Sequence, residues 1–94
     1  MQVDRFEWDD EKARINLVKH KVNFETARLV FEDENAQDDL DDREGYGEAR
    51  SNRTGLADGK LITVTYTERD DLIRIISARK ATRREQQIYF ERRG

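Results

Sequence analysis

Three polar residues interrupt an otherwise apolar stretch in the second half of the chain, Leu72–Ala81. The β-branched isoleucines of this stretch predict a buried strand that runs into a helix. By the two-residue period of a strand, Arg74 points to one face, and Ser77 and Arg79 point to the other, unless a bulge or the strand end intervenes. An arginine in a buried strand is costly unless a carboxylate or a phosphate meets it. The strand is therefore either an ion-paired core element or the floor of an anion-binding site.

The composition limits the kinds of site that the chain can build. Its 94 residues predict one domain over residues 1–94. With no cysteine and one histidine, the chain has no disulfide, thiolate metal site or polyhistidine metal site, and we predict no cofactor and no metal. No apolar run approaches the roughly 20 residues of a membrane span, and the N-terminus lacks a signal-peptide pattern. We therefore expect a cytoplasmic protein that does not contact a membrane.

Charge is distributed unevenly along the chain. Residues 1–48 have a balance of −8 and residues 49–94 a balance of +5. The basic half predicts a surface for a polyanion, and the acidic half predicts a surface for a basic protein. A solvated surface of mixed charge explains the same counts, so charge alone does not decide between them.

Hydrophobic periodicity predicts an α+β fold: an antiparallel sheet of three to four strands with an N-terminal helical hairpin and a C-terminal helix. The expected elements, in chain order, are a short strand at Phe6–Trp8, a helix from Asp9 or Asp10 to about Lys19, a second helix after Asn23, a loop or short edge strand at Ala36–Leu40, an outer strand at 48–54, a strand at 61–67, the strand within Leu72–Ala81 and a helix from about Lys80 to Arg92.

Three of these elements carry side chains that have either a structural role or a role at a ligand site, depending on their surroundings. The first helix places Ala13 and Leu17 on one face, and Asn16 lies on this face too. His20 shares the face and lies beside the apolar stripe at the helix end. His20 is then either a half-buried structural histidine or a titrating group near a substrate. The strand at 61–67 turns Tyr66 to the core and its threonines to solvent or to a ligand. In the last helix, Glu85 is placed to pair with Arg74 or Arg79.

A series of residues, in a fixed order over about residues 5–90, resembles the sequence pattern of BrnT-type toxins. The Trp-Asp start, the Lys-His pair and the Ile-Ser-Ala-Arg block together make the resemblance fairly specific. Glu34 departs from the pattern, because many members have a proline there. The residues that carry the resemblance are Phe6, Trp8, Asp9, Lys12, Asn16, Lys19, His20, Val22, Phe24, Ala27, Phe31, Gly47, Glu48, Arg50, Thr67, Arg69, Arg74–Arg79, Ala81, Glu85 and Tyr89.

This resemblance implies a ribonuclease toxin of a type II toxin–antitoxin pair, with a fold similar to that of RelE-type toxins and RNA as its substrate. It also implies a cognate antitoxin with a ribbon-helix-helix DNA-binding part. The chain would then meet operator DNA only through the complex with that antitoxin. The alternative is a non-catalytic module, a degenerate toxin that binds RNA or a protein partner without cutting RNA.

RNA can be cut without a metal when a base activates the 2′-hydroxyl, an acid protonates the leaving 5′-oxygen and cations stabilise the charge on the phosphate. Arginine forks match phosphate oxygens, and aromatic rings stack on splayed bases. The same arginines can instead form internal ion pairs, Arg50 with Glu48 and Arg79 with Glu85. The expected catalytic residues are His20, Glu48, Arg50 and Arg79, and the expected RNA-binding residues are Trp8, Lys19, Tyr66, Arg69 and Arg74.

Overall fold

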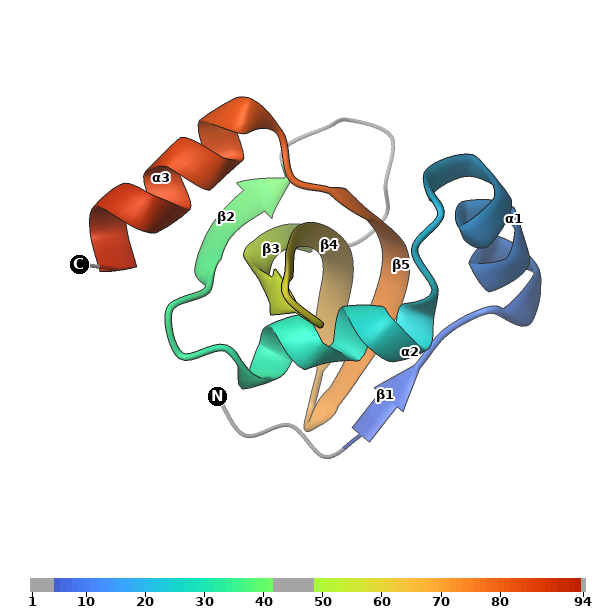
Figure 1. The fold of residues 1–94 in the computed structure, drawn as a ribbon. Coiled ribbons are helices and arrows are strands. Elements are labelled where there is room, and N and C mark those ends of the chain that lie inside the picture. The colour runs from blue at the N-terminus through green and yellow to red at the C-terminus, as the bar shows by residue number, and fades with distance from the viewer. Residues whose placement is uncertain (1–4, 42–48, 94) are drawn as a thin grey trace.

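A five-stranded sheet organises the protein in the computed structural model, which describes residues 5–41 and 49–93. The helical segment α2–η1 lies along one face of the sheet, and α3 begins over the opposite face (Figure 1). The elements, in chain order, are β1 (Arg5–Glu7), α1 (Asp10–His20), α2 (Phe24–Ala27), the 3-10 helix η1 (Arg28–Glu32), β2 (Gln37–Asp41), β3 (Arg50–Ala57), β4 (Lys60–Arg69), β5 (Leu72–Lys80) and α3 (Arg83–Arg93).

The strand order is β1-β5-β4-β3-β2. All neighbours are antiparallel except β1, which runs parallel to β5. The predicted α+β class is confirmed, but the sheet has five strands and not the predicted three to four, because β1 adds a parallel edge strand to the four antiparallel strands β2–β5. The strand predicted at 48–54 as an outer strand is an inner one, because β2 pairs along its free side.

The hydrophobic core lies between α2–η1 and the sheet. Asn23 caps α2 by accepting a hydrogen bond from the Thr26 backbone at 2.7 Å, as its residue type predicts. The helical segment then buries an apolar stripe whose spacing follows the turn of a helix. The buried residues of this stripe are Phe24, Ala27, Val30 and Phe31, and the strand residues that complete the core are Ala57, Ile62, Val64, Tyr66, Ile73, Ile75 and Ala78.

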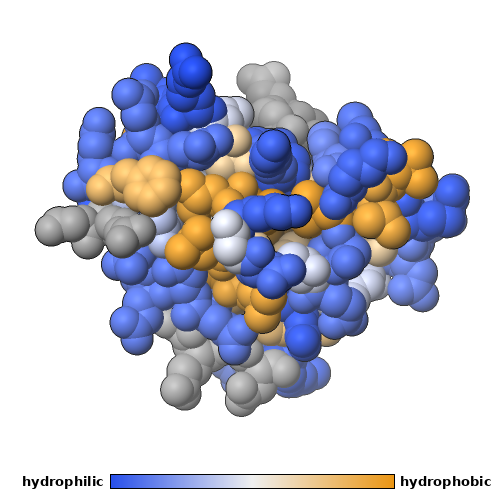
Figure 2. All heavy atoms as spheres, in the orientation of Figure 1, coloured by the Kyte–Doolittle hydropathy of each residue, from blue (hydrophilic) through white to orange (hydrophobic). Residues whose placement is uncertain are grey.

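Helix α1 packs only partly as predicted, because Asn16 is buried on the predicted inward face but Leu17 is exposed. Its large apolar residues face outward: Ile15 is 50% exposed, Leu17 46% and Val18 64%. Ala13 is partly buried and packs against the core. Asn16 is the buried residue of the helix instead. Figure 2 shows apolar side chains at the surface over α1 as well as over the middle of the molecule. Helix α1 is therefore held to the sheet by a polar contact, and its apolar side is left at the surface.

The threonines of β4 are buried, so the predicted alternative that they face solvent is wrong. Thr63 donates to Glu85 Oε1 at 3.0 Å, and its hydroxyl lies 2.7 Å from that of Thr54. Thr65 donates to Asn52 Oδ1 at 2.6 Å. These bonds satisfy the hydroxyls in the absence of bulk water, which is why threonines are tolerated there.

Within the described ranges, no helix has the length and apolar character needed to cross a membrane.

Candidate functional site

An irregularity in the β4–β5 ladder decides which side chains of β5 share a face. Ser77 pairs with Thr65, but Ile75 pairs with Tyr66, the next residue of β4. Ile76 is therefore an extra residue, a β-bulge. Residues directly opposite each other in a ladder point to the same side of the sheet. The bulge thus places Arg74 on the same face as Ser77 and Arg79, which corrects the prediction of opposite faces for a regular strand.

Strand β3 continues this polar face on the other side of β4. Asn52 pairs with Thr65, so their side chains share the face that Ser77 occupies on β5. Arg50 lies two residues before Asn52 and points to the same side by strand alternation. Asp41 of β2 pairs with Arg50 across the next ladder. Four neighbouring strands therefore contribute polar side chains to one surface.

Asn16 fixes the end of α1 against this surface. Its amide donates to the backbone oxygens of Ala78, at 2.8 Å, and of Val22, at 3.0 Å. Its Oδ1 accepts from the Ala78 backbone N–H at 3.1 Å. The side chain therefore occupies the edge of β5 at a position beyond its short pairing with β1. Because Lys19 and His20 lie one turn after Asn16, this clamp brings them beside β5.

These elements enclose a pocket of about 570 Å³, which we call the sheet pocket. It is lined by residues from α1, β2, β3, β4 and β5, namely Lys19, His20, Asp41, Arg50, Asn52, Thr65, Ile76, Ser77 and Arg79. Among the described residues of this lining, Lys19, Arg50 and Arg79 bring positive charge and Asp41 brings one carboxylate. A concave site with this charge attracts anions. The pocket brings together three of the four predicted catalytic residues and the predicted RNA-binding residue Lys19.

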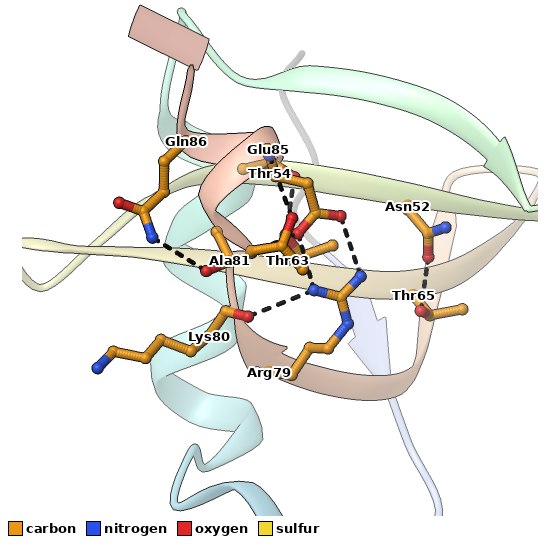
Figure 3. Close-up of polar contacts among 10 residues, drawn as sticks. Asn52, Thr54, Thr63, Thr65, Arg79, Lys80, Ala81, Glu85 and Gln86 are labelled. Atoms are coloured by element: carbon orange, nitrogen blue, oxygen red, sulfur yellow. Dashed lines mark hydrogen bonds and ion pairs between the residues drawn. The ribbon is translucent and has the colours of Figure 1, made fainter. Parts of the chain in front are cut away.

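Arg79 is the best-defined cation of the sheet pocket. Its Nη1 and Nη2 donate to the two carboxylate oxygens of Glu85, at 2.8 and 3.0 Å, and Nη1 also donates to the Lys80 backbone oxygen at 3.3 Å (Figure 3). Burial raises the pKa of Glu85, but hydrogen bonds from Arg79 and the Thr82 backbone, the charge of Arg79 and a bond from Thr63 outweigh it and lower this pKa to about 2. The predicted pairing of Glu85 with an arginine is therefore confirmed for Arg79.

Two predicted RNA-binding aromatic residues lie away from the sheet pocket. Tyr66 is 5% exposed in the core, where its ring meets Phe31 edge-on and its hydroxyl donates to Asp38 Oδ1 at 2.8 Å. Burial and the Asp38 carboxylate raise the pKa of Tyr66 above its ordinary value. This placement argues against Tyr66 stacking on a base. Trp8 packs edge-on against Phe24 and lines a separate pocket beside β1.

The other predicted residues are also separate from the sheet pocket. Arg74 donates to Glu7 of β1 at 2.6 Å, and both side chains are about two-fifths exposed. Arg69 is exposed at the far end of β4. Neither is among the described residues that line the sheet pocket. Glu48, predicted as a catalytic residue, lies outside the described residues.

Sequence reasoning missed several residues that shape the pocket. Asn52 could have been found, because it alternates with Arg50 along a strand. Asp41 could not, because its place depends on how β2 and β3 are aligned. Ile76 gives no local signal of a bulge.

Within residues 5–41 and 49–93, no three His, Cys, Asp or Glu side chains form a group that could hold a metal ion.

Comparison with known proteins supplies the family. A search of curated proteins found no match. A family model described as "Ribonuclease toxin, BrnT, of type II toxin-antitoxin system" matches residues 8–85, which is most of the chain. The match spans every element that lines the sheet pocket, from α1 to β5. The chain therefore belongs to the BrnT family of ribonuclease toxins of type II toxin–antitoxin systems.

Proposed function

We propose that the chain is an endoribonuclease that cuts RNA without a metal, and that the sheet pocket is its active site. The observation that carries this proposal is the convergence of His20, Arg50 and Arg79 on one pocket from α1, β3 and β5. The family supports ribonuclease activity. The metal-independent mechanism and the roles of individual residues are our own proposal, supported by the positive lining of the pocket.

The proposed reaction is transfer of the phosphate ester to the neighbouring 2′-oxygen. A base removes the 2′-hydroxyl proton, the 2′-oxygen bonds to phosphorus, and the bond to the 5′-oxygen breaks as an acid protonates that oxygen. The products are a 2′,3′-cyclic phosphate end and a 5′-hydroxyl end. His20 and Glu48 supply the acid and the base, and Arg50 and Arg79 stabilise the negative charge on the phosphate. The role of Glu48 depends only on its sequence position two residues before Arg50.

The proposal includes the partners that the family suggests. A type II toxin has a cognate antitoxin, and we propose that this antitoxin carries a ribbon-helix-helix DNA-binding part. The chain then reaches operator DNA only within that complex. We further propose that residues 1–94 act as a single toxin domain, and that its fold is similar to that of RelE-type toxins.

Cleavage of purified RNA in the presence of EDTA tests the proposal, with and without ribosomes. The wild-type chain should cut RNA and leave cyclic phosphate ends. Replacing Arg50 or Arg79 by alanine should lower the rate by about 100-fold or more. Lys60→Ala is the matched control, because it removes an exposed cation at the start of β4, away from the pocket.

Two results would count against the proposal. If the folded wild-type chain leaves RNA intact with and without ribosomes, the enzyme proposal fails. If EDTA abolishes cleavage and magnesium restores it, the metal-independent mechanism fails while ribonuclease activity stands. Circular dichroism of each variant shows whether a lost activity comes from an unfolded chain.

A non-catalytic module that binds RNA or a protein partner is the second candidate function. The outward apolar side of α1 favours it, because Ile15 and Val18 are at least half exposed, and exposed apolar groups mark interaction surfaces. Such a module would bind RNA in a salt-dependent way, through its basic side chains, and yield no cleavage product. Binding measured on the same RNA that is tested for cleavage separates the two candidates.

A further inference from the structure

The first turn of α3 holds Arg79 through Glu85. The Thr82 hydroxyl accepts from the Glu85 backbone N–H at 3.1 Å, and Glu85 Oε1 accepts from the Thr82 backbone N–H at 2.8 Å. This reciprocal pair is a capping box, which fixes the start of a helix and the rotamer of its glutamate. The carboxylate is therefore positioned by the backbone of α3 as well as by Arg79.

The same carboxylate joins three strands of the sheet. Glu85 Oε1 also accepts from Thr63 of β4, and the Thr63 hydroxyl lies 2.7 Å from that of Thr54 on β3. Figure 3 shows these contacts as one connected group that ends at the guanidinium of Arg79. Oε1 and Oε2 together receive four hydrogen bonds, which leaves the carboxylate little freedom to move.

Glu85 and Arg79 differ in their access to the sheet pocket. Arg79 lines the pocket, and 36% of its side chain is exposed. The Glu85 side chain is 25% exposed and is not among the described residues that line the pocket. A phosphate in the pocket therefore meets Arg79, with Glu85 behind it. The contact that links Glu85 to the pocket is therefore its pair with Arg79.

We infer that Glu85 is a positioning residue for RNA cleavage, which holds the guanidinium of Arg79 in the orientation that stabilises the charged phosphate; the inference rests on the proposed function. A long arginine side chain that is already fixed loses less freedom when the transition state forms. The charge of Arg79 attracts RNA whether or not the side chain is fixed. Loss of Glu85 should therefore lower kcat much more than it changes KM.

A purely structural role for Glu85 makes different predictions. If Glu85 only stabilised α3, its replacement would lower the melting temperature, and activity well below that temperature would persist. The effect on activity would also be independent of Arg79. A double-mutant cycle separates these cases, because two residues that act through one contact give non-additive effects.

The experiment measures kcat and KM for RNA cleavage by the wild-type chain, Glu85→Gln, Arg79→Ala and the double variant. Glu85→Gln should lower kcat roughly 10- to 100-fold, with KM within about twofold. In the Arg79→Ala background, Glu85→Gln should have no further effect. Two controls should keep the wild-type kcat. Glu11→Gln neutralises a glutamate paired with Arg14 on α1, and Tyr89→Phe removes the hydroxyl bond between α3 and Asp33.

Three results would overturn the inference, and the third of them would also overturn the proposed function. A wild-type kcat for Glu85→Gln shows that Arg79 needs no positioning. Equal losses from Glu85→Gln in both backgrounds show that Glu85 acts independently of Arg79. If the wild-type chain itself cuts no RNA, the proposed function fails and the inference fails with it. In the first two cases the proposed function stands, because the wild-type chain is active.

Discussion

Arg74 and Arg79 lie on the same face of β5, although an odd number of positions separates them. Arg74 pairs with Thr67 and Arg79 with Thr63, and the bulge at Ile76 supplies the extra residue that this requires. At about 3.3 Å per residue, the two Cα atoms are roughly 15 Å apart. The shared face therefore has two separate cationic ends. Arg79 lies in the sheet pocket, and Arg74 pairs with Glu7 at the edge strand β1.

Replacing Arg74 by alanine tests whether the second cationic end takes part in cleavage. We expect a cleavage rate within about threefold of wild type, in contrast to the large loss in Arg79→Ala. The free energy of unfolding should fall by no more than about 1 kcal/mol, because the Arg74–Glu7 pair is well exposed. Initial cleavage rates and urea unfolding measure both quantities. Equal losses of activity in the two variants would instead extend the RNA-binding surface along the whole strand.

Asn16→Ala should destabilise the protein more than any surface change on α1. The variant leaves the Ala78 backbone N–H and oxygen without their Asn16 partners in a buried place, at a cost of about 2–4 kcal/mol. It should also lower cleavage in chains that remain folded, because the end of α1 with Lys19 and His20 loses its attachment to β5. Urea unfolding and RNA cleavage measure the two effects.

Asn23→Ala is the matched control for this variant. It also removes an asparagine side chain near the α1–α2 connection, but the lost bond is an exposed helix cap that contributes about 1 kcal/mol. We expect Asn23→Ala to keep wild-type cleavage. If both variants lose the same small amount of stability and activity, Asn16 is not the attachment point that the contacts indicate.

Much of the fold follows from local sequence patterns. The stripe from Phe24 to Phe31 has helical spacing, and Asn23 caps it, so both the element and its buried face are predictable. The Asp58–Gly59 turn is predictable for the same reason: positive φ values of 53° and 80° suit these residue types. The parallel pairing of β1 is not predictable, because three residues carry too little pattern to fix a partner strand.

The candidate site is predictable in its residue types and only partly in its arrangement. Glu85 lies on the helix face that packs back toward the sheet, so its pairing with an arginine could be expected. A bulge is one alternative for this strand, but its position at Ile76 could not be predicted, and it decides the face on which Arg74 lies. The prediction for helix α1 is wrong at Leu17. The helix is oriented by the hydrogen bonds of the Asn16 side chain to Ala78 of β5, and this orientation leaves Leu17 exposed. Hydrogen bonds between elements that are far apart in the chain produce no periodic pattern in the amino-acid sequence.

Gly55→Ala tests the close packing of β3 against the end of η1. An added Cβ would lie 3.0 Å from Ala36 Cβ and 3.1 Å from Val30 Cγ1, closer than packed carbon atoms normally approach. We expect a loss of about 1–3 kcal/mol in the free energy of unfolding. Gly59→Ala is a useful comparison, because its Cβ would enter open space and any loss comes from the positive φ of the turn alone. Unchanged stability in Gly55→Ala would mean that β3 and η1 separate easily.

The pKa of Glu85 predicts how the stability of the protein depends on pH. Its pKa falls from an ordinary 4.5 to about 2 in the folded protein, chiefly because bonds from Arg79 outweigh the burial that raises it. The folded state therefore holds the carboxylate ionised at pH values where the unfolded state binds a proton. The stability that this provides is fully present above about pH 4.5 and is lost as the pH falls toward 2.

Glu85→Gln removes this dependence, because glutamine does not titrate. Between pH 6 and pH 3, the wild-type chain should lose about 1–2 kcal/mol more unfolding free energy than the variant, a range that allows for the partial exposure of the pair. The Asp33 carboxylate also has a lowered pKa, but it titrates alike in both proteins and cancels in the comparison. Urea unfolding at the two pH values measures the difference. Equal losses in both proteins would show that Arg79 does not hold the carboxylate of Glu85 in solution.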